Sequence, residues 1–386
     1  MTADNSISDP ERTGRIARLA RFEQRFGRSG RLLRAPGRVN LIGEHTDYNH
    51  GLVLPMNTGL YTHLVLAPRQ DRKLHAYAAS VDQHALIDLD GPCPDTSWMR
   101  YIWGAAHMTE AQGLALPGFD LLIEGDLPLG GGLSSSASLL SALVLGFTES
   151  LQQSVSPVAI ARLVQRIENE VIGVQAGIMD PFVINCCPRA HALLLDCHDL
   201  THDSYPWPDH WPLLLIDSGV RHELADGAYN QRRQQCQAAA HALGIESLRA
   251  MNAAQLATLA GTLAGQRARH VHAENQRVRD AAHCLKNGDI YGLGQLLDAS
   301  HASLRDDFDV SCPELDSLVA LAQATPGVLG ARMVGGGFGG CVLVLLDPDR
   351  ASAAEQHLLA ELVQQQGAVP WHHRVAPADP AGVCPR

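Results

Sequence analysis

Lysine is nearly absent from this chain of 386 residues, since Lys73 and Lys286 are the only two lysines among its 30 basic side chains. Neither lysine follows a glycine-rich turn, so the sequence contains no P-loop, whose Gly-Lys-Ser/Thr end binds phosphates. Both lysines lie in polar stretches, which argues against a catalytic lysine that forms a Schiff base. Any cationic catalytic role is therefore expected to fall to an arginine.

Long apolar runs and paired cysteines are also missing. No apolar run approaches the ~18 residues of a membrane span, and the N-terminus is polar, so we expect neither a membrane segment nor a signal peptide. The nine cysteines form no CxxC pair, which favours reduced thiols and a cytoplasmic location. We expect a monomer, although no residue pattern determines the oligomeric state.

The charge balance argues against nucleic acid as a partner. The formal net charge is −11, which is the wrong sign for a general nucleic-acid binder. Residues 1–38 are an exception, with nine arginines and four acidic residues. Apolar residues recur there at helical spacing between Glu11 and Phe26, so the arginines are interpreted as the polar side of a helix.

The length and the 46% hydrophobic content predict two domains with substantial cores, which we divide into residues 1–205 and 206–386. Strand and helix patterns mix without regular βα alternation, which predicts an α+β architecture. Expected strands cover 38–42, 52–55, 60–66, 85–89, 118–123, 190–196, 213–217, 330–334 and 341–346. Expected helices cover 11–26, 98–112, 137–151, 156–172, 223–243, 253–285, 289–305, 313–324 and 351–366.

A glycine- and serine-rich loop gives the strongest functional signal. Three consecutive glycines allow close backbone approach to a ligand, and the serines after them open a buried helix whose N-terminus favours phosphate. A flexible linker is the alternative, but linkers do not run into buried helices. The predicted nucleotide-binding residues are Gly130, Gly131, Gly132, Leu133, Ser134, Ser135 and Ser136.

The same loop suggests a Mg²⁺ site, because a serine hydroxyl ligates this ion at other nucleotide sites. Ser136 is the candidate ligand, and a carboxylate should complete the pair, since Mg²⁺ prefers oxygen donors. Glu168 fits at the edge of the apolar stripe of the helix predicted over 156–172, although such a residue can also be a plain polar boundary.

Residues 37–49 place Glu44, His45 and Asp47 within four positions, directly after a strand. Two carboxylates and an imidazole on one turn are suited to binding several hydroxyl groups. A metal site and an ordinary polar turn are the competing interpretations; the HExxH pattern of zinc sites is missing.

Asp180, which follows Gly177 and two apolar residues, is either a turn or cap residue or a positioned base. Residues 335–340 satisfy the GxGxxG pattern of dinucleotide sites, but an apolar strand pattern follows them in place of a helix. We therefore interpret this segment as a turn between two strands.

Taken together, these motifs resemble the GHMP kinases and, within them, the galactokinases. Residues 37–49 are similar to the sugar signature, Pro128–Leu139 to the phosphate loop and Gly330–Cys341 to the third motif of that family. Two further segments, Ser218–His222 with Tyr229 and Ser303–Leu315, also match. The resemblance extends over about residues 34–346, most of the chain.

The resemblance implies the two-domain GHMP kinase fold, with an N-terminal domain like ribosomal protein S5 domain 2, a ferredoxin-like C-terminal domain and an active site between them. It implies phosphorylation of the anomeric hydroxyl of galactose, with ATP as co-substrate and Mg²⁺ as cofactor. Matching positions would make Asp180 and Arg38 catalytic and Ser136 and Glu168 the metal ligands. Residues that would line the sugar pocket are Glu44, His45, Asp47, Gly177 and Tyr229, and Tyr101 and Trp103 are candidate adenine contacts.

One departure from the family pattern concerns the residue after the catalytic aspartate, where Pro181 replaces the usual glutamine. Proline removes a backbone donor and restricts the conformation of Asp180, which puts the loop geometry and the sugar selectivity in question. A kinase for N-acetylgalactosamine, arabinose or a uronic acid is therefore the alternative. A non-catalytic galactose sensor is a further one, which the Ser136-Ala137 pair disfavours.

Overall fold

Two β-sheets organise the molecule, which is described here from a computed structural model covering residues 9–128, 131–221 and 225–384. The larger sheet contains β1 (Arg31–Asn40), β2 (Leu52–Val53), β3 (Pro55–Pro68), β4 (Lys73–Ala78), β5 (Gln83–Asp88), β6 (Phe119–Gly125), β7 (His191–Asp196), β8 (His202–Pro206) and β13 (Gly382–Val383). Its main path runs β13–β1–β3–β6–β4–β5, and β7 joins it through β3. The smaller sheet has the order β10 (Val328–Met333), β11 (Gly339–Leu346), β9 (Leu213–Arg221) and β12 (His372–Arg374).

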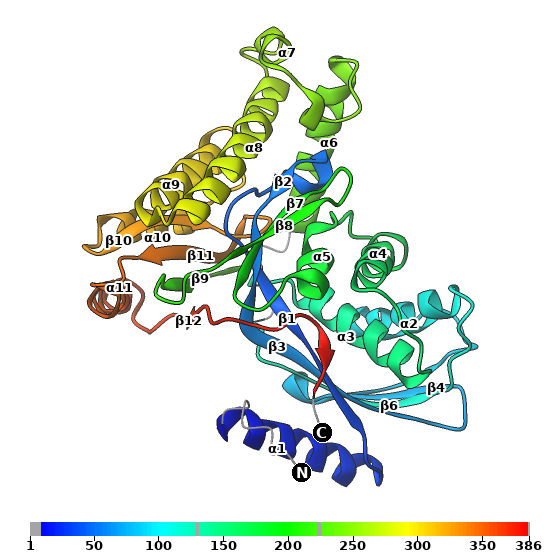
Figure 1. Ribbon diagram of the computed structural model, residues 1–386. Coiled ribbons are helices and arrows are strands. Elements are labelled where there is room, and N and C mark those ends of the chain that lie inside the picture. Colours follow the sequence, from blue (N-terminus) through cyan, green and yellow to red (C-terminus); the bar gives the residue numbers. More distant parts are fainter. Residues whose placement is uncertain (1–8, 129–130, 222–224, 385–386) are drawn as a thin grey trace.

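Helices cover both faces of the larger sheet. One face packs against α2 (Ser97–Glu110), α3 (Ser135–Ser150), α4 (Pro157–Ile167) and α5 (Met179–Cys186). On the opposite face, α1 (Asp9–Phe26) buries Phe22 against strand residues such as Val65 and Leu122. Its arginines reach the sheet, as in the 2.6 Å ion pair between Arg21 and Glu124. Figure 1 shows α1 on the side of this sheet that faces away from α2 and α3.

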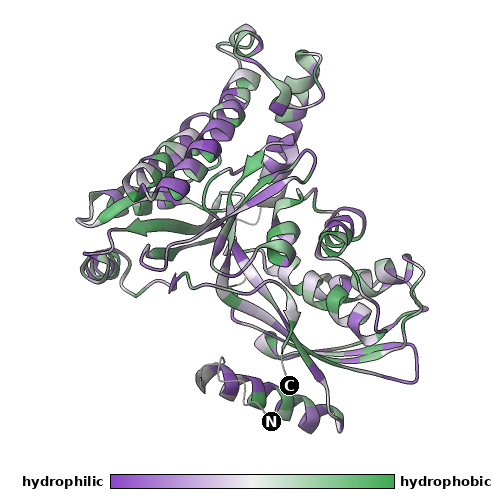
Figure 2. Ribbon diagram, viewed as in Figure 1, coloured by the Kyte–Doolittle hydropathy of each residue, from purple (hydrophilic) through white to green (hydrophobic). Residues whose placement is uncertain are grey.

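The smaller sheet is buried on both faces, which explains the continuous apolar runs of its strands. Along β11, Val342 and Val344 point into a core shared with the helices of this half, while Leu343 and Leu345 point toward the larger sheet. The helices are α6 (Ala225–Ala242), α7 (Ala253–Thr258), α8 (Leu263–Asn287), α9 (Ile290–Asp306), α10 (Pro313–Ala324) and α11 (Ala351–Gln366). Their hydrophilic outer surfaces are visible in Figure 2.

A third apolar core joins the two halves. Val39, Leu41 and Ile42, at and after the end of β1, pack with Leu215 and Leu343 of the smaller sheet. These residues directly precede the Glu44–Asp47 turn, so the packing between the halves positions that turn. Among the helices in the described ranges, none has the length and apolarity that a membrane crossing needs.

The α+β class and most predicted elements are confirmed. The single helix predicted over 253–285 is wrong: the chain turns at 259–262, and the Thr262 hydroxyl caps α8 by accepting from Gly265 N–H at 3.0 Å. Strands β4, β8, β12 and β13 and helix α5 were not predicted. Because β13 pairs with β1, the C-terminal segment contributes to both sheets, and a boundary at 205/206 stays a proposal.

Candidate active site

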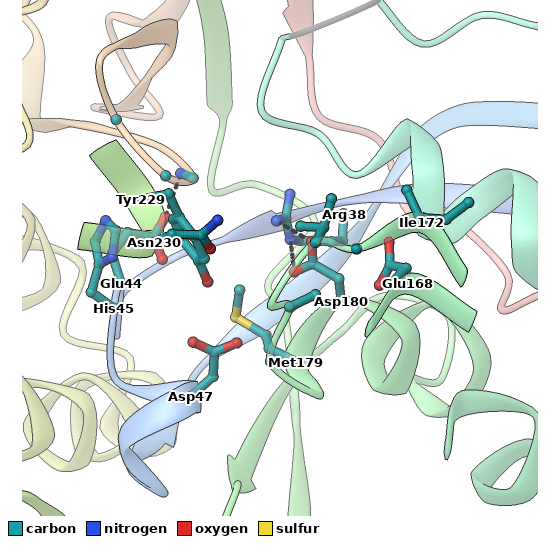
Figure 3. Close-up of a pocket in the computed structure, with 17 residues that line it drawn as sticks. Arg38, Glu44, His45, Asp47, Glu168, Ile172, Met179, Asp180, Tyr229 and Asn230 are labelled. Carbon is teal, nitrogen blue, oxygen red and sulfur yellow. Dashed lines mark hydrogen bonds and ion pairs between the residues drawn. The ribbon is translucent and has the colours of Figure 1, made fainter. Parts of the chain in front are cut away.

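An arginine–aspartate pair lies at the centre of the cavity between the two halves. Arg38 is buried near the end of β1, and its Nε and Nη2 atoms donate to the two carboxylate oxygens of Asp180 at 2.7 and 2.6 Å. This fork geometry fixes both side chains in one plane. Figure 3 shows the pair pointing into a cavity of about 500 Å³.

Arg38 also holds the glycine- and serine-rich loop against the same carboxylate. Its Nη1 atom donates to the carbonyl of Gly132 at 2.6 Å, and its backbone N–H donates to the carbonyl of Leu133 at 3.2 Å. The Ser134 hydroxyl donates to Asp180 Oδ2. One guanidinium therefore links the candidate base to the candidate phosphate loop, two segments about fifty positions apart.

The loop enters α3 with the geometry expected of an anion site. Ser134 precedes the helix in the left-handed region at φ 59°, and its side chain does not cap the helix. The first N–H groups of α3 thus have no capping side chain and are available to an anion, on the positive end of the helix dipole. Gly131–Ser136 lie at this position, whereas Gly130 lies outside the described residues.

Ser136 and Glu168 are brought together, as the sequence predicted for a metal pair. The Ser136 hydroxyl donates to Glu168 Oε1 at 2.9 Å, and the buried Oε2 atom has no hydrogen-bond partner within the described residues. Glu168 opens a π-helical turn, Glu168–Ile172, where the predicted 156–172 helix leaves the α conformation after Ile167. An unpartnered carboxylate oxygen beside a hydroxyl fits a small oxygen-seeking cation.

The described residues contain no cluster of three or more His, Cys, Asp and Glu side chains placed for a metal ion. A cation at Ser136 and Glu168 would therefore take its remaining ligands from phosphate or water, as Mg²⁺ does at nucleotide sites. Burial and, to a smaller extent, the nearby charge of Asp180 raise the pKa of Glu168 to about 8. A cation would hold this carboxyl ionised.

The turn after β1 supplies the opposite side of the cavity. Glu44, His45 and Asp47 line it together with Tyr229 and Asn230 of α6, and Figure 3 shows them across from the Arg38–Asp180 pair. Burial lowers the pKa of His45 to about 3, an effect that neighbouring His270 increases, so this imidazole is neutral. Its Nδ1 atom shares a 2.8 Å hydrogen bond with the Tyr48 hydroxyl.

Asp47 is a buried carboxyl with an altered acidity. Burial raises its pKa to about 7, and the charge of Asp180 contributes in the same direction. Gly177 lies against it: a Cβ atom at Gly177 would stand 1.7 Å from Asp47 Oδ2. The glycine is therefore required by the close approach of this carboxylate.

Replacing Gly177 by alanine should displace the Asp47 carboxylate from the cavity. For the sugar and the ATP that the family resemblance implies, the loss of a hydrogen bond to a charged group, about 1.5–3 kcal/mol, should raise the KM for the sugar at least about tenfold and leave the KM for ATP within about twofold. Steady-state kinetics with each substrate varied in turn measure both constants. An unchanged sugar KM in Gly177→Ala would contradict the placement of Asp47.

Asp47 should also make the stability pH-dependent. Its folded-state pKa lies above the ordinary value, so between about pH 4 and 7 the folded protein binds more protons than the unfolded chain. The free energy of unfolding therefore falls as the pH rises through this range. Urea unfolding of the wild type and of Asp47→Asn at a series of pH values measures this effect. The free energy of unfolding of the wild type, relative to that of Asp47→Asn, should fall from pH 4 to 7 and stay constant above pH 7.

A second, apolar cavity of about 430 Å³ adjoins the phosphate loop. Trp98, Tyr101 and Leu139 line it beside Ser135 and Ser136. Its aromatic and aliphatic walls suit a flat heterocyclic base. Of the two candidate adenine contacts, Tyr101 lines this cavity, whereas Trp103 stacks on His107 at 4.4 Å and is not part of the lining.

The third glycine-rich motif is a turn between β10 and β11, as predicted, and the dinucleotide interpretation is excluded because a strand follows it. Its backbone touches the phosphate loop: a Cβ atom at Gly335 would lie 3.2 Å from the carbonyl oxygen of Gly132. Gly335, Gly336 and Gly337 line the large cavity. The motif therefore forms the wall between the phosphate loop and the Glu44–Asp47 turn, which matches the sugar signature and is called the sugar turn below.

Pro181 fits the local structure without strain. Asp180 and Pro181 are the second and third residues of α5, whose first turn lacks intrahelical N–H partners. Proline is tolerated there because the missing donor would not be used. The Pro181 carbonyl accepts from Asn185 Nδ2 at 2.7 Å, so the departure from the family pattern leaves Asp180 in place.

These features together define a kinase of small molecules, with a phosphate loop, an arginine-held carboxylate and a hydroxyl-binding turn around one cavity. Comparisons with known proteins agree. The galactokinase galactose-binding signature matches residues 20–68, the GHMP kinase N-terminal domain matches residues 100–186 and the GHMP kinase C-terminal domain matches residues 281–364.

Similar proteins span nearly the whole chain. The galactokinase of Bos taurus is 43% identical over 92% of this chain and 94% of its own length. The galactokinase of Homo sapiens is 42% identical over 87% of this chain and 89% of its own length. The structure of Lactococcus lactis galactokinase complexed with galactose matches with a TM-score of 0.90 at 31% identity, covering 96% of this chain and 99% of that one.

Methanococcus jannaschii mevalonate kinase has a TM-score of 0.69 at 18% identity, covering 91% of this chain and 99% of its own, which is a likeness of fold alone. The chain belongs to the galactokinase family of GHMP kinases. It is a phosphotransferase with an alcohol group as the acceptor.

Sequence reasoning missed some contacts that shape the site. The link from Arg38 to the Gly132 carbonyl and the bond from Ser134 to Asp180 join residues far apart in the chain, and no local pattern indicates them. Arg332 of β10, which contacts Glu44, was also missed; the one local signal is an arginine inside an otherwise apolar strand.

Proposed function

We propose that this protein transfers the γ-phosphoryl group of ATP to the anomeric hydroxyl of D-galactose, giving α-D-galactose 1-phosphate and ADP. The observation that carries this proposal is the Arg38–Asp180 pair, which faces the sugar turn and is bonded to the phosphate loop through Gly132. A nucleotide phosphate and a sugar hydroxyl bound at these two places would meet at Asp180.

In this mechanism, Asp180 orients the anomeric hydroxyl and accepts its proton as the oxygen–phosphorus bond forms and the bond to the leaving ADP oxygen breaks. Such transfers depend on alignment and charge neutralisation more than on a strong base. Arg38 keeps the Asp180 carboxylate in place and adds positive charge beside the transferring group. The N–H groups at the start of α3 bind phosphate oxygens.

Ser136 and Glu168 would hold Mg²⁺, which when bound neutralises the charge on the nucleotide phosphates. The apolar cavity lined by Trp98 and Tyr101 supports a base-binding role beside this loop. Glu44, His45, Asp47, Gly177 and Tyr229 would surround the sugar. Hydroxyl groups suit this lining because the carboxylates accept hydrogen bonds, and neutral His45 offers a ring nitrogen to the same cavity.

A sugar panel tests the proposal. ADP release is measured with ATP and, in turn, galactose, N-acetylgalactosamine, arabinose and galacturonic acid. We expect galactose to give the highest kcat/KM. A preference for N-acetylgalactosamine would show that galactose is the wrong acceptor sugar but that the protein still transfers phosphate from ATP. No ADP release with any sugar would overturn the catalytic assignment.

A further inference from the structure

Arg332 is a fully buried arginine within the Gly330–Cys341 motif, to which no role was assigned above. It lies on β10, three positions before the glycine-rich turn, and is 0% exposed. Its guanidinium crosses to the sugar turn of the other half of the molecule, where Nη2 lies 2.9 Å from Glu44 Oε1. Nη1 donates to the carbonyl of Leu41 at 2.8 Å.

Glu44 has further contacts with the protein itself. Oε1 also accepts from the Gly335 N–H at 2.8 Å, and Oε2 accepts from Asn40 Nδ2. A carboxylate offers about four acceptor positions; hydrogen bonds fill one on each oxygen, and the Arg332 guanidinium lies against Oε1 as an ion pair, so the second position on Oε2 is free of these contacts. Because Glu44 lines the cavity, this position is available to a sugar hydroxyl.

The arrangement depends on Arg332 for physical reasons. A buried carboxylate without a cation is costly and takes up a proton, which turns an acceptor into a donor. Burial raises the pKa of Glu44, and the Arg332 charge opposes that rise. Other charged groups around Glu44 are Arg38, which also favours its ionised form, and Asp47.

We propose that Arg332 is a positioning residue for the sugar: it fixes the Glu44 carboxylate in one orientation, so that one Oε2 acceptor position meets a hydroxyl of the substrate. The proposal rests on the proposed function, since it assumes that the sugar binds against Glu44. Arg332 acts through Glu44 and does not touch the reacting atoms. Through Gly335, the same carboxylate links the sugar turn to the third glycine-rich motif.

Steady-state kinetics of Arg332→Met, Glu44→Gln and the double variant test the proposal. We expect Arg332→Met to raise the KM for galactose about tenfold or more, with the KM for ATP and kcat within about threefold. Since Arg332 acts through Glu44, the double variant should be no worse than the more impaired of the two single variants. A structural defect without this link would give additive losses.

A matched control separates sugar positioning from loss of stability. Arg69→Met takes an arginine from another buried carboxylate, Asp120, which it contacts at 2.7 Å at a site remote from the cavity. It should lower the thermal midpoint but leave the galactose KM unchanged. If Arg332→Met does not fold, Arg332→Gln replaces it, because an amide can still donate to the Leu41 carbonyl while the cation beside Glu44 is removed.

The results discriminate clearly. A galactose KM equal to that of the wild type in folded Arg332→Met or, failing that, in Arg332→Gln would overturn the proposal, as would additive losses in the double variant. A wild-type protein that turns over no sugar would instead overturn the proposed function, independently of the Arg332 variants.

Discussion

Asp180→Ala should abolish steady-state turnover while galactose still binds. The substitution removes the proposed proton acceptor, the carboxylate that Arg38 holds by two hydrogen bonds. A positioned general base contributes roughly 10²–10⁴-fold to a rate, so the rate of a single turnover should fall by at least about 10³-fold with the added misalignment. The sugar pocket residues stay in place, since Glu44 and Asp47 belong to another segment.

Rapid-quench measurements with γ-labelled ATP give the single-turnover rate, and calorimetry gives the galactose dissociation constant. Asp379→Ala is the matched control, because it also removes an arginine-paired carboxylate, 2.8 Å from Arg34, outside the cavity lining. The control should retain full turnover. Substantial phosphoryl transfer by Asp180→Ala would show that Asp180 is not the base.

Elements with strong local signals could be predicted from the sequence. Ser156 and Pro157 mark the start of α4, and the Ser156 hydroxyl accepts from Ala159 N–H at 3.2 Å as a cap does. The serine run followed by an all-round apolar segment likewise indicated α3. In both cases the information lies within a few residues, which is the range that capping and hydrophobic periodicity cover.

The short helix α5 shows where local signals fail. It has eight residues, Met179–Cys186. Proline is tolerated only in the first turn of a helix, so Pro181 argues against a helix unless the starting residue is already known. Its position depends on tertiary packing, since Phe182 and Val183 are buried against the larger core. Local residues therefore left Asp180 open between a turn residue and a base, and its assignment came from the family resemblance.

Contacts between distant segments were beyond sequence reasoning of this kind. Ser136 and Glu168 were paired by residue type and by the family pattern, but the buried Oε2 atom could not be foreseen. The close approach of Asp47 to Gly177, which leaves no room for a Cβ atom unless the carboxylate moves, becomes visible only in the structure. Arg332 gave a weak signal, because a charged residue in a buried strand implies a partner without identifying it.

The scarcity of lysine has a structural counterpart in the cavity. Among the described residues that line it, Arg38 is the only arginine, and its guanidinium donates both to the Asp180 carboxylate and to the Gly132 carbonyl of the phosphate loop. Arg332, on β10, neutralises the charge of Glu44 in the sugar turn through an ion pair. Arginine suits both positions because its planar fork makes several hydrogen bonds at fixed angles, which a lysine ammonium does not.

Glu168→Gln should change how the reaction depends on Mg²⁺. The amide keeps the shape of the side chain and its contact with Ser136 but offers the ion no negative charge. Loss of groups that only support a metal ligand costs about 10–100-fold, so loss of the ligand itself should lower kcat/KM for ATP by more than about 100-fold. The Mg²⁺ concentration for half-maximal rate should rise, and excess Mg²⁺ should restore part of the activity.

Glu170→Gln provides the matched control, since Glu170 lies on the same π-helical turn but is exposed and pairs with Arg166 at 2.8 Å. Its Mg²⁺ dependence should equal that of the wild type. Folding offers an independent check: removal of a buried carboxyl whose pKa is about 8 should make Glu168→Gln more stable than the wild type at pH 9 without Mg²⁺. If Glu168→Gln keeps the wild-type Mg²⁺ dependence, the ion is held elsewhere and the ligand assignment is wrong.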